Sequence, residues 1–360
     1  MKRAYLFSIF LIIALTTYAQ AKKINVIAYY SGNISEIDNY DITKLTHIIY
    51  SFCHLKGNEL YVGSAQIPII KKLVSLKQKN ARLKIQLALG GWGGCKTCSE
   101  AFSTKQGREA FSASTKKLLD ELEVDGIDLD WEYPAVQGPE GHQFLPEDKP
   151  NFTELVKSLR NALGTKKEIS FAAGGFPAFL EQAIEWKKVM PLVDRVHLMS
   201  YDLVNRDSDS TGHHTGLYST PNQISSADNS VRYLRSIGIG ADKLVIGMAF
   251  YARIFETKKE ETTGLYQPAE FKSFLVSREY ANTFGAEAGY VSLWDSTAHA
   301  PYSYNKTKKM FATYDNERSI AEKTEYAIKN KLNGVMFWEL RQDKPKDGLL
   351  DVIYKTINKP

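Results

Sequence analysis

The sequence is short of cysteine, with only three among its 360 residues. Cys95 and Cys98 lie in the segment GGCKTC, and Cys53 ends an earlier apolar run. A zinc site needs more clustered ligands than these, and the seven histidines show no metal-ligand spacing. We therefore expect no metal and no cofactor. In an oxidising compartment the three cysteines predict one disulfide and one free thiol, and the sequence leaves the pairing open.

The sequence also lacks a strong excess of charge of either sign. Its 46 basic and 41 acidic side chains give a formal net charge of +5, and they form no basic stripe. A nucleic acid is therefore not expected as a partner, whereas a neutral ligand fits this balance. Beyond the N-terminus, no apolar run is long enough to cross a bilayer.

The one long apolar run lies at the N-terminus. Lys2 and Arg3 precede AYLFSIFLIIALTTYA, which ends in small residues. This layout predicts a signal peptide over residues 1–19, cleaved after Ala19 or Ala21. An uncleaved membrane anchor is the alternative, but the run is short for a membrane span. We expect a secreted or periplasmic protein that has no membrane association after cleavage and is a monomer.

The rest of the chain alternates strand-like and helix-period segments. Near-continuous apolar strands between helices are typical of a parallel sheet covered by helices, and eight such strands close a (β/α)8 TIM barrel. The predicted class is therefore α/β, with a doubly wound open sheet as the alternative. The eight predicted strands are residues 24–30, 47–53, 84–90, 124–131, 168–174, 194–201, 244–251 and 334–340.

The last two predicted strands are separated by about 80 residues, too many for a structureless loop in a compact domain. We therefore predict a small α+β insertion domain over residues 252–312. The catalytic barrel would then comprise residues 22–251 and 313–360. An insert after the seventh strand emerges at the C-terminal face of a barrel, where active sites are built, so it would form one wall of a groove.

The segment DGIDLDWEYP, residues 125–134, places three acids at alternating positions of a strand. Asp128, Asp130 and Glu132 therefore share one face, about 6–7 Å apart along the strand. If they face the barrel interior, the three groups cannot all be ionised in a medium of low dielectric constant, so they must share protons. This coupling can keep Glu132, at the top of the column, protonated as a general acid requires.

The column points to glycosidic chemistry, but the usual pair of carboxylates does not fit it. Asp130 lies below Glu132 on the same strand face, so it is poorly placed to attack the opposite side of a sugar. A 2-acetamido group on the substrate can supply its own carbonyl oxygen and form an oxazolinium intermediate. Asp130 would then orient the acetamido group instead of attacking carbon.

DGIDLDWEYP resembles the DGxDxDWEYP signature of the family 18 glycoside hydrolases, the chitinases. Further segments resemble family motifs in the same order, and they cover essentially the whole mature chain: KIQLALGGW, MSYD, GMAFYAR, LWDSTAHAPYSYN, ATYDNERSI and GVMFWEL. The resemblance implies a TIM barrel with a chitinase insertion domain. It also implies a chitinase that cleaves β-1,4-linked N-acetylglucosamine in chitin or chito-oligosaccharides, with retention of configuration.

The resemblance implies a role for each catalytic residue. Glu132 would donate a proton to the glycosidic oxygen, and Asp130 would hold the acetamido nitrogen. Asp128 would exchange the shared proton, and Tyr201 would donate its hydroxyl to the acetamido oxygen. The substrate-binding residues that the resemblance implies are Trp338, Asp202, Met199, Tyr133, Tyr29, Phe52, Gly91, Trp92, Met248, Tyr251 and Arg253.

The chain departs from the family pattern at three positions. Some members have a serine where this chain has Ala88, so one hydroxyl is missing from the Asp128 network. Ala249 and Ala252 replace a proline and a glycine. The alternatives are an endo-β-N-acetylglucosaminidase acting on N-glycans and a non-catalytic chitin-binding lectin. Lectin-like members usually lose the acid, which this chain keeps as Glu132.

Overall fold

A computed structural model describes residues 24–260 and 263–359. The predicted signal peptide and its cleavage site lie outside this range. No helix in the described part of the chain is long and apolar enough to cross a bilayer.

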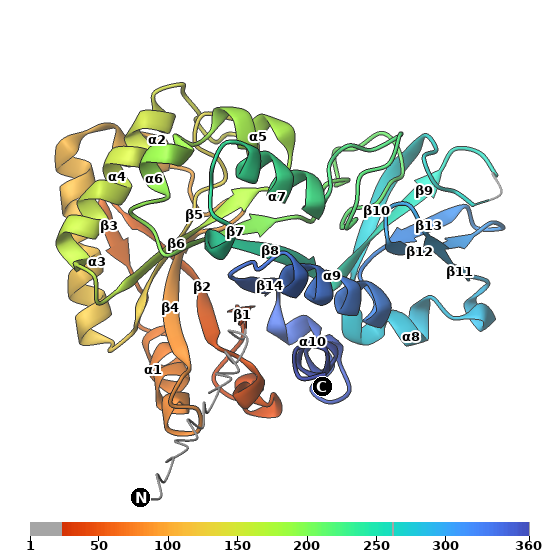
Figure 1. The fold of residues 1–360 in the computed structure, drawn as a ribbon, viewed down its shortest axis with the longest axis horizontal. Coiled ribbons are helices and arrows are strands. Elements are labelled where there is room, and N and C mark those ends of the chain that lie inside the picture. The colour runs from red at the N-terminus through yellow and green to blue at the C-terminus, as the bar shows by residue number, and fades with distance from the viewer. Residues whose placement is uncertain (1–23, 261–262, 360) are drawn as a thin grey trace, which may run out of the picture.

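The core of the molecule is a closed barrel of eight parallel strands (Figure 1). Each strand pairs in parallel with its neighbours, and pairing of the first with the second closes the ring. The predicted TIM barrel is thus confirmed, and the open sheet is excluded. The strands are β1 (Asn25–Tyr30), β2 (His47–Lys56), β4 (Lys84–Gly90), β5 (Gly126–Asp130), β6 (Glu168–Gly174), β7 (Arg195–Met199), β8 (Leu244–Ala249) and β14 (Gly334–Trp338). A short strand, β3 (Glu59–Tyr61), pairs antiparallel with β2.

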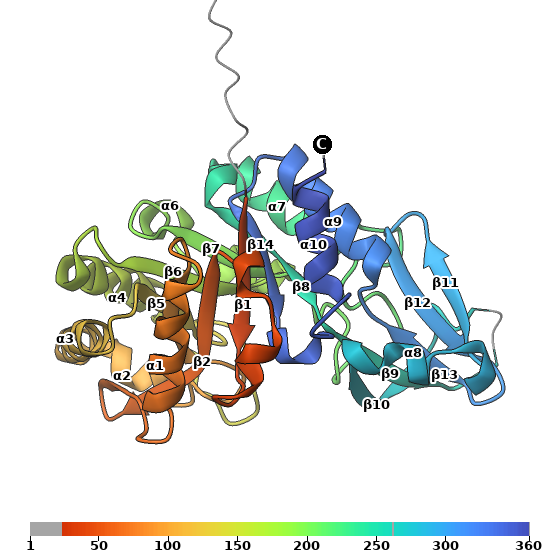
Figure 2. The ribbon, with the colours of Figure 1, turned by 90° about the horizontal axis from the view of Figure 1, so that it is seen from below.

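Helices cover the outside of the barrel (Figures 1 and 2). They are amphipathic, as α4 illustrates: Phe152, Leu155, Val156 and Leu159 recur at helical spacing and are buried. The helices are α1 (Ile67–Ser75), α2 (Cys98–Ser103), α3 (Lys105–Glu121), α4 (Asp148–Leu163), α5 (Pro177–Gln182), α6 (Trp186–Val189), α7 (Ala227–Ser236), α9 (Glu317–Lys329) and α10 (Leu349–Ile357).

The barrel strands separate two apolar cores because their side chains alternate between the two faces. Ile127, Leu129 and Trp131 belong to the large core between strands and helices. The barrel interior is filled by a smaller cluster, which includes Tyr29 and Met199. The acids that alternate with the apolar residues of β5 therefore face the interior.

A second sheet lies beside the barrel, inserted between β8 and α9 (Figures 1 and 2). It is antiparallel, with the order β10-β9-β13-β12-β11, and spans residues 251–313, one residue beyond the predicted insert at each end. The loop after β7 also packs on this sheet, through Val204 and a bridge between Ser210 and Pro268. The elements are β9 (Tyr251–Thr257), β10 (Ala269–Val276), α8 (Tyr280–Thr283), β11 (Val291–Asp295), β12 (Ala300–Asn305) and β13 (Met310–Thr313).

The structure also pairs the cysteines. Cys95, in the loop that follows β4, forms a disulfide with Cys98, the first residue of α2. Cys53 is a buried free thiol, and burial raises its pKa to about 12, so it is a poor nucleophile.

Candidate active site

The carboxyl ends of the barrel strands meet at one mouth. Asp128 and Asp130 lie on β5, and Glu132 lies two residues beyond the end of that strand. Asp128 is fully buried, while Asp130 and Glu132 are 4% and 7% exposed. The exposure of the three side chains thus rises slightly from β5 to the segment that follows it.

Asp128, at the base of the column, is held by three donors. It accepts hydrogen bonds from the hydroxyls of Tyr29 (2.8 Å) and Ser170 (2.6 Å). The Nδ1 atom of His197 lies 3.3 Å from its Oδ1. Burial on its own raises the pKa of Asp128, but the His197 imidazole and these hydrogen bonds outweigh it, so that pKa lies below its usual value. Asp128 therefore carries the negative charge of the column.

Two of these donors were missed by the sequence analysis. Ser170 lies directly opposite Asp128 in the β5–β6 register, and Ala88 lies opposite it on β4. The hydroxyl that Ala88 lacks is thus supplied from the other neighbouring strand. The inward direction of His197 could have been predicted from the sequence. In the strand segment VHLMS it alternates with Met199, so both side chains lie on the same face.

Asp130 lies in a contrasting environment. Its Oδ1 atom is buried and has no hydrogen-bond partner in the described part of the chain. Burial, together with the charges of Glu132 and Asp128, raises the pKa of Asp130 well above its usual value. The surroundings of Asp130 therefore favour its protonated form.

Glu132 has the raised pKa that a general acid needs. Burial is the main cause and the charge of Asp202 adds to it, whereas a hydrogen bond with Tyr133 opposes it, and the resulting pKa is about 7. A large fraction of Glu132 is therefore protonated at neutral pH.

Asp202, which raises the pKa of Glu132, comes from the loop after β7 and is itself paired. Arg253 of β9 donates two hydrogen bonds of 2.7 Å to its two carboxylate oxygens. Burial raises the pKa of Asp202, but His214 and Arg253 outweigh burial and hold it well below its usual value. The Nδ1 atom of His214 lies 3.6 Å from Asp202 Oδ1, a contact that the sequence did not reveal.

Tyr201 lies at the end of β7, beside the acids. Its hydroxyl is 3.9 Å from the sulfur of Met336, and its ring meets Tyr251 edge-on at 6.2 Å. Burial and the charges of Asp130 and Glu132 raise the pKa of Tyr201 well above its usual value. The hydroxyl therefore keeps its proton and can act as a donor.

An aromatic floor lies at the end of β14. Trp338 is partly exposed and stacks on Phe52, with ring centres 5.4 Å apart and planes 15° apart. Its ring centre is 5.8 Å from that of Tyr29, which in turn binds Asp128. The floor is thus linked to the base of the acid column.

The turn after β4 requires glycine. Gly91 has φ +78°, and a side chain there would come within 2.4 Å of the Phe52 ring. The turn presents Trp92, which is 55% exposed, with its ring centre 6.4 Å from that of Tyr133.

The prediction that Met248 contacts the substrate is wrong. Met248 is fully buried in the core between strands and helices, so it faces away from the mouth. The reason is the alternation of β8, because Gly247 lies against the Tyr201 ring on the inward face and Met248 takes the outward face. The inward positions next to it are therefore Gly247 and Ala249.

Comparison with known proteins identifies the family. Residues 25–343 match the model of the glycosyl hydrolases family 18. The chain belongs to family 18. The resemblance carried by DGIDLDWEYP is thus confirmed.

Several relatives in family 18 resemble the chain over most of its length. Chitinase A1 of Niallia circulans is 32% identical over 305 residues, which cover 77% of this chain and 43% of that protein. Probable chitinase 2 of Drosophila melanogaster is 27% identical over 85% of this chain and 68% of that protein. The chain therefore spans less than half the length of the first of these relatives.

Solved structures of family 18 enzymes show the same fold. An N-acetylglucosaminidase from Paenibacillus barengoltzii is 34% identical, with a TM-score of 0.85 over 92% of this chain and 99% of that one. Chitinase ChiA74 from Bacillus thuringiensis is 26% identical, with a TM-score of 0.87 over 93% of this chain and 70% of that one.

Proposed function

We propose that this family 18 member is a secreted chitinase that hydrolyses β-1,4-linked N-acetylglucosamine with retention, through an oxazolinium intermediate. The observation that carries the proposal is the state of the carboxyl groups around Glu132. Asp130 lies below Glu132, at the end of β5, and Asp202 accepts two hydrogen bonds from Arg253. Neither is placed to attack the sugar, so the substrate's own acetamido oxygen is the nucleophile that remains.

In the proposed reaction, protonated Glu132 donates its proton to the glycosidic oxygen as the bond breaks. The acetamido carbonyl oxygen attacks the anomeric carbon from the other face and closes the oxazolinium ring. Water, deprotonated by Glu132, then opens the ring and restores the original configuration.

The residues below Glu132 guide the acetamido group. Protonated Asp130 holds and polarises the acetamido group, while Asp128 stabilises that proton from beneath. Tyr201 donates its hydroxyl to the acetamido oxygen and so fixes it close to the anomeric carbon. Trp338 forms the floor under the sugar that reacts, and Asp202 and Met199 line the same subsite.

The remaining side chains are proposed to contact neighbouring sugar units. Tyr251 and Arg253 lie on the side of the small sheet, and the exposed Trp92 with Tyr133 lies beyond the turn after β4. Phe52, Tyr29 and Gly91 shape the floor. Export is supported by the N-terminal sequence and by the Cys95–Cys98 disulfide, which an oxidising compartment favours.

The names of the relatives support a substrate built from N-acetylglucosamine but allow different products. Chitinase A1 and ChiA74 are named chitinases, whereas the Paenibacillus barengoltzii protein is named an N-acetylglucosaminidase. Release of single N-acetylglucosamine units is therefore a second candidate. The small sheet beside the mouth favours a groove for a linear chain.

The product profile from a defined chito-hexaose tests the proposal. We expect chitobiose and other short oligomers, with the β-anomer formed first because configuration is retained. A parallel digestion of a high-mannose glycoprotein should give no product. Cleavage of the glycoprotein alone would replace the proposal by an endo-β-N-acetylglucosaminidase, and release of monomer alone would support the second candidate.

The pH dependence should report the protonation of Glu132. Because the acid works in its protonated form and its pKa is about 7, kcat/KM should fall as the pH rises through about 7. The Asp202→Asn variant removes a negative charge that raises the pKa of Glu132. In this variant kcat/KM should therefore fall at a lower pH than in the parent enzyme. A fall centred near pH 4.5 in the parent enzyme would contradict the role given to Glu132.

A further inference from the structure

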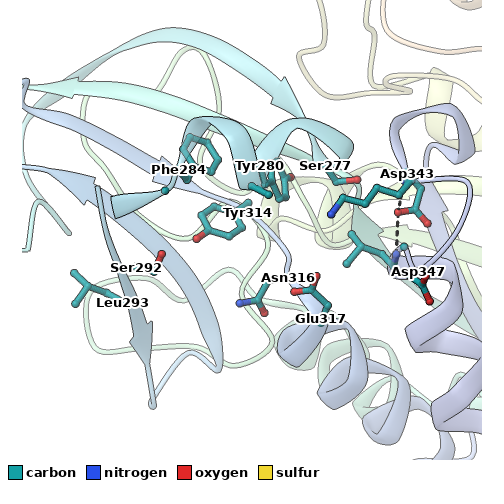
Figure 3. Close-up of a pocket in the computed structure, with 15 residues that line it drawn as sticks. Ser277, Tyr280, Phe284, Ser292, Leu293, Tyr314, Asn316, Glu317, Asp343 and Asp347 are labelled. Atoms are coloured by element: carbon teal, nitrogen blue, oxygen red, sulfur yellow. Dashed lines mark hydrogen bonds between the residues drawn. The ribbon is translucent and has the colours of Figure 1, made fainter. Parts of the chain in front are cut away.

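A cavity of about 300 Å³ lies between α8, the N-terminal end of α9 and the loop from β14 to α10 (Figure 3). Its lining contains none of the residues of the proposed active site. It lies against the face of the small sheet that carries Ala252 and Ile254, whereas Arg253 points to the opposite face. Its volume is at the lower end of the range for ligand pockets.

One wall of the cavity is aromatic. The ring of Tyr314 is stacked on that of Phe284, with centres 5.3 Å apart, and lies 5.0 Å from that of Tyr280. Figure 3 shows these three rings together above the cavity, opposite Asn316 and Glu317. An aromatic wall of this kind packs against the C–H face of a sugar ring.

The lining of the cavity also contains polar groups that have no hydrogen-bond partner in the described part of the chain. The Tyr280 hydroxyl is buried and has no hydrogen-bond partner in the described part of the chain. Within the same part of the chain, the side chains of Glu317, Asp347 and Lys344 make no hydrogen bond or ion pair. By contrast, the carboxyl group of Asp343 is already bound, because it accepts three backbone N–H bonds, each of 2.8 Å.

These free groups are mixed in kind. Two carboxylates are acceptors, one ammonium group is a donor, and the tyrosine hydroxyl can do both. No group of three or more potential metal ligands occurs among residues 24–260 and 263–359. The lining therefore suits a neutral ligand that has several hydroxyl groups and one apolar face.

We propose that this cavity is a second carbohydrate-binding site, which takes one pyranose unit of an N-acetylglucosamine oligosaccharide. The ring wall contacts the apolar face of the sugar, and Glu317, Asp347 and Tyr280 bind its hydroxyls. The choice of N-acetylglucosamine, but not the site itself, rests on the proposed function.

Calorimetric titration with N,N′-diacetylchitobiose tests this site on the full chain. The Glu132→Gln variant prevents hydrolysis, and adding Trp338→Ala weakens the catalytic cleft. In this double variant we expect binding to persist. Ala281→Trp, which places a large side chain at the exposed rim of the cavity, should weaken this binding by about tenfold or more. Tyr280→Phe, which removes one hydroxyl, should weaken it by about fivefold.

The matched control is Ala286→Trp, also at an exposed position but outside the cavity lining, which should leave binding unchanged. In an otherwise unaltered chain, Ala281→Trp should leave hydrolysis of soluble chito-oligomers unchanged. The proposal is overturned if the double variant, with the cavity unaltered, no longer binds the disaccharide. It is also overturned if adding Ala281→Trp to the double variant leaves this binding unchanged. If the cleft neither binds nor hydrolyses chito-oligomers, the proposed function fails, while the cavity titration still gives its own answer.

Discussion

The Glu132→Gln variant is expected to bind chito-oligosaccharides about as tightly as the parent enzyme and to lose about a thousandfold in kcat. Glutamine has nearly the same shape as protonated glutamic acid and keeps one hydrogen-bond donor at the mouth. It has no acidic proton to give to the glycosidic oxygen, and no base to activate water in the second step. The affinity for the substrate should therefore be kept while kcat is lost.

The measurement is a pair of experiments on one soluble substrate. Calorimetry gives the affinity of the variant for chito-hexaose, and initial rates give kcat and KM. Glu154→Gln, on the exposed face of α4, is the matched control and should behave like the parent. A variant at position 132 that hydrolyses chito-oligomers at the parental rate would remove Glu132 from the reaction.

The distinct states of the three acids explain why the loss should be so large. Asp128 favours its charged form because Tyr29, Ser170 and His197 bind it. Asp130 favours its protonated form because its Oδ1 is buried without a partner in the described part of the chain and two other carboxyl groups lie near it. Glu132 is left at the mouth with a pKa near neutrality. Glu132 is thus the proton donor at the position where the glycosidic oxygen is expected, and neither Asp128 nor Asp130 is placed to replace it.

The sequence was sufficient to predict this column because alternation along one strand is a local property. Asp128 and Asp130 share a face of β5 whatever surrounds them, and the apolar residues that alternate with them must then be buried on the other side. The strand ends at Asp130, so alternation alone places Glu132 only just beyond the end of the strand. The eight strands were predicted for the same reason, since each is a short apolar run between polar turns.

Contacts between strands could not be predicted in this way. That Ser170 and His197 bind Asp128 depends on the register of β5, β6 and β7, which one sequence does not specify. The pairing of Asp202 with Arg253 likewise joins the loop after β7 to the small sheet. The error at Met248 is different, because alternation along β8 was available and would have placed that side chain outside the barrel.

Oligosaccharides that lack the N-acetyl group at the reacting sugar should be hydrolysed at least about a thousandfold more slowly than chito-oligomers. An attacking group held within the same molecule is worth a very high effective concentration, and its removal leaves only water from solution. No protein carboxylate replaces it, because Asp130 is behind Glu132 and Asp202 is held by Arg253. Cello-oligosaccharides of matched length are the simplest test.

Partially deacetylated chitosan gives the sharper version of this test, because every chain offers both kinds of bond to the same enzyme. If the acetamido oxygen attacks, each new reducing end must carry an N-acetyl group, whereas the unit on the other side of the cut can be of either kind. Mass spectrometry or NMR of the products reads this directly. Glu132→Gln titrated with the same polymer separates poor binding from slow chemistry. Unacetylated sugars appearing at new reducing ends would show that the acetamido oxygen is not the required nucleophile.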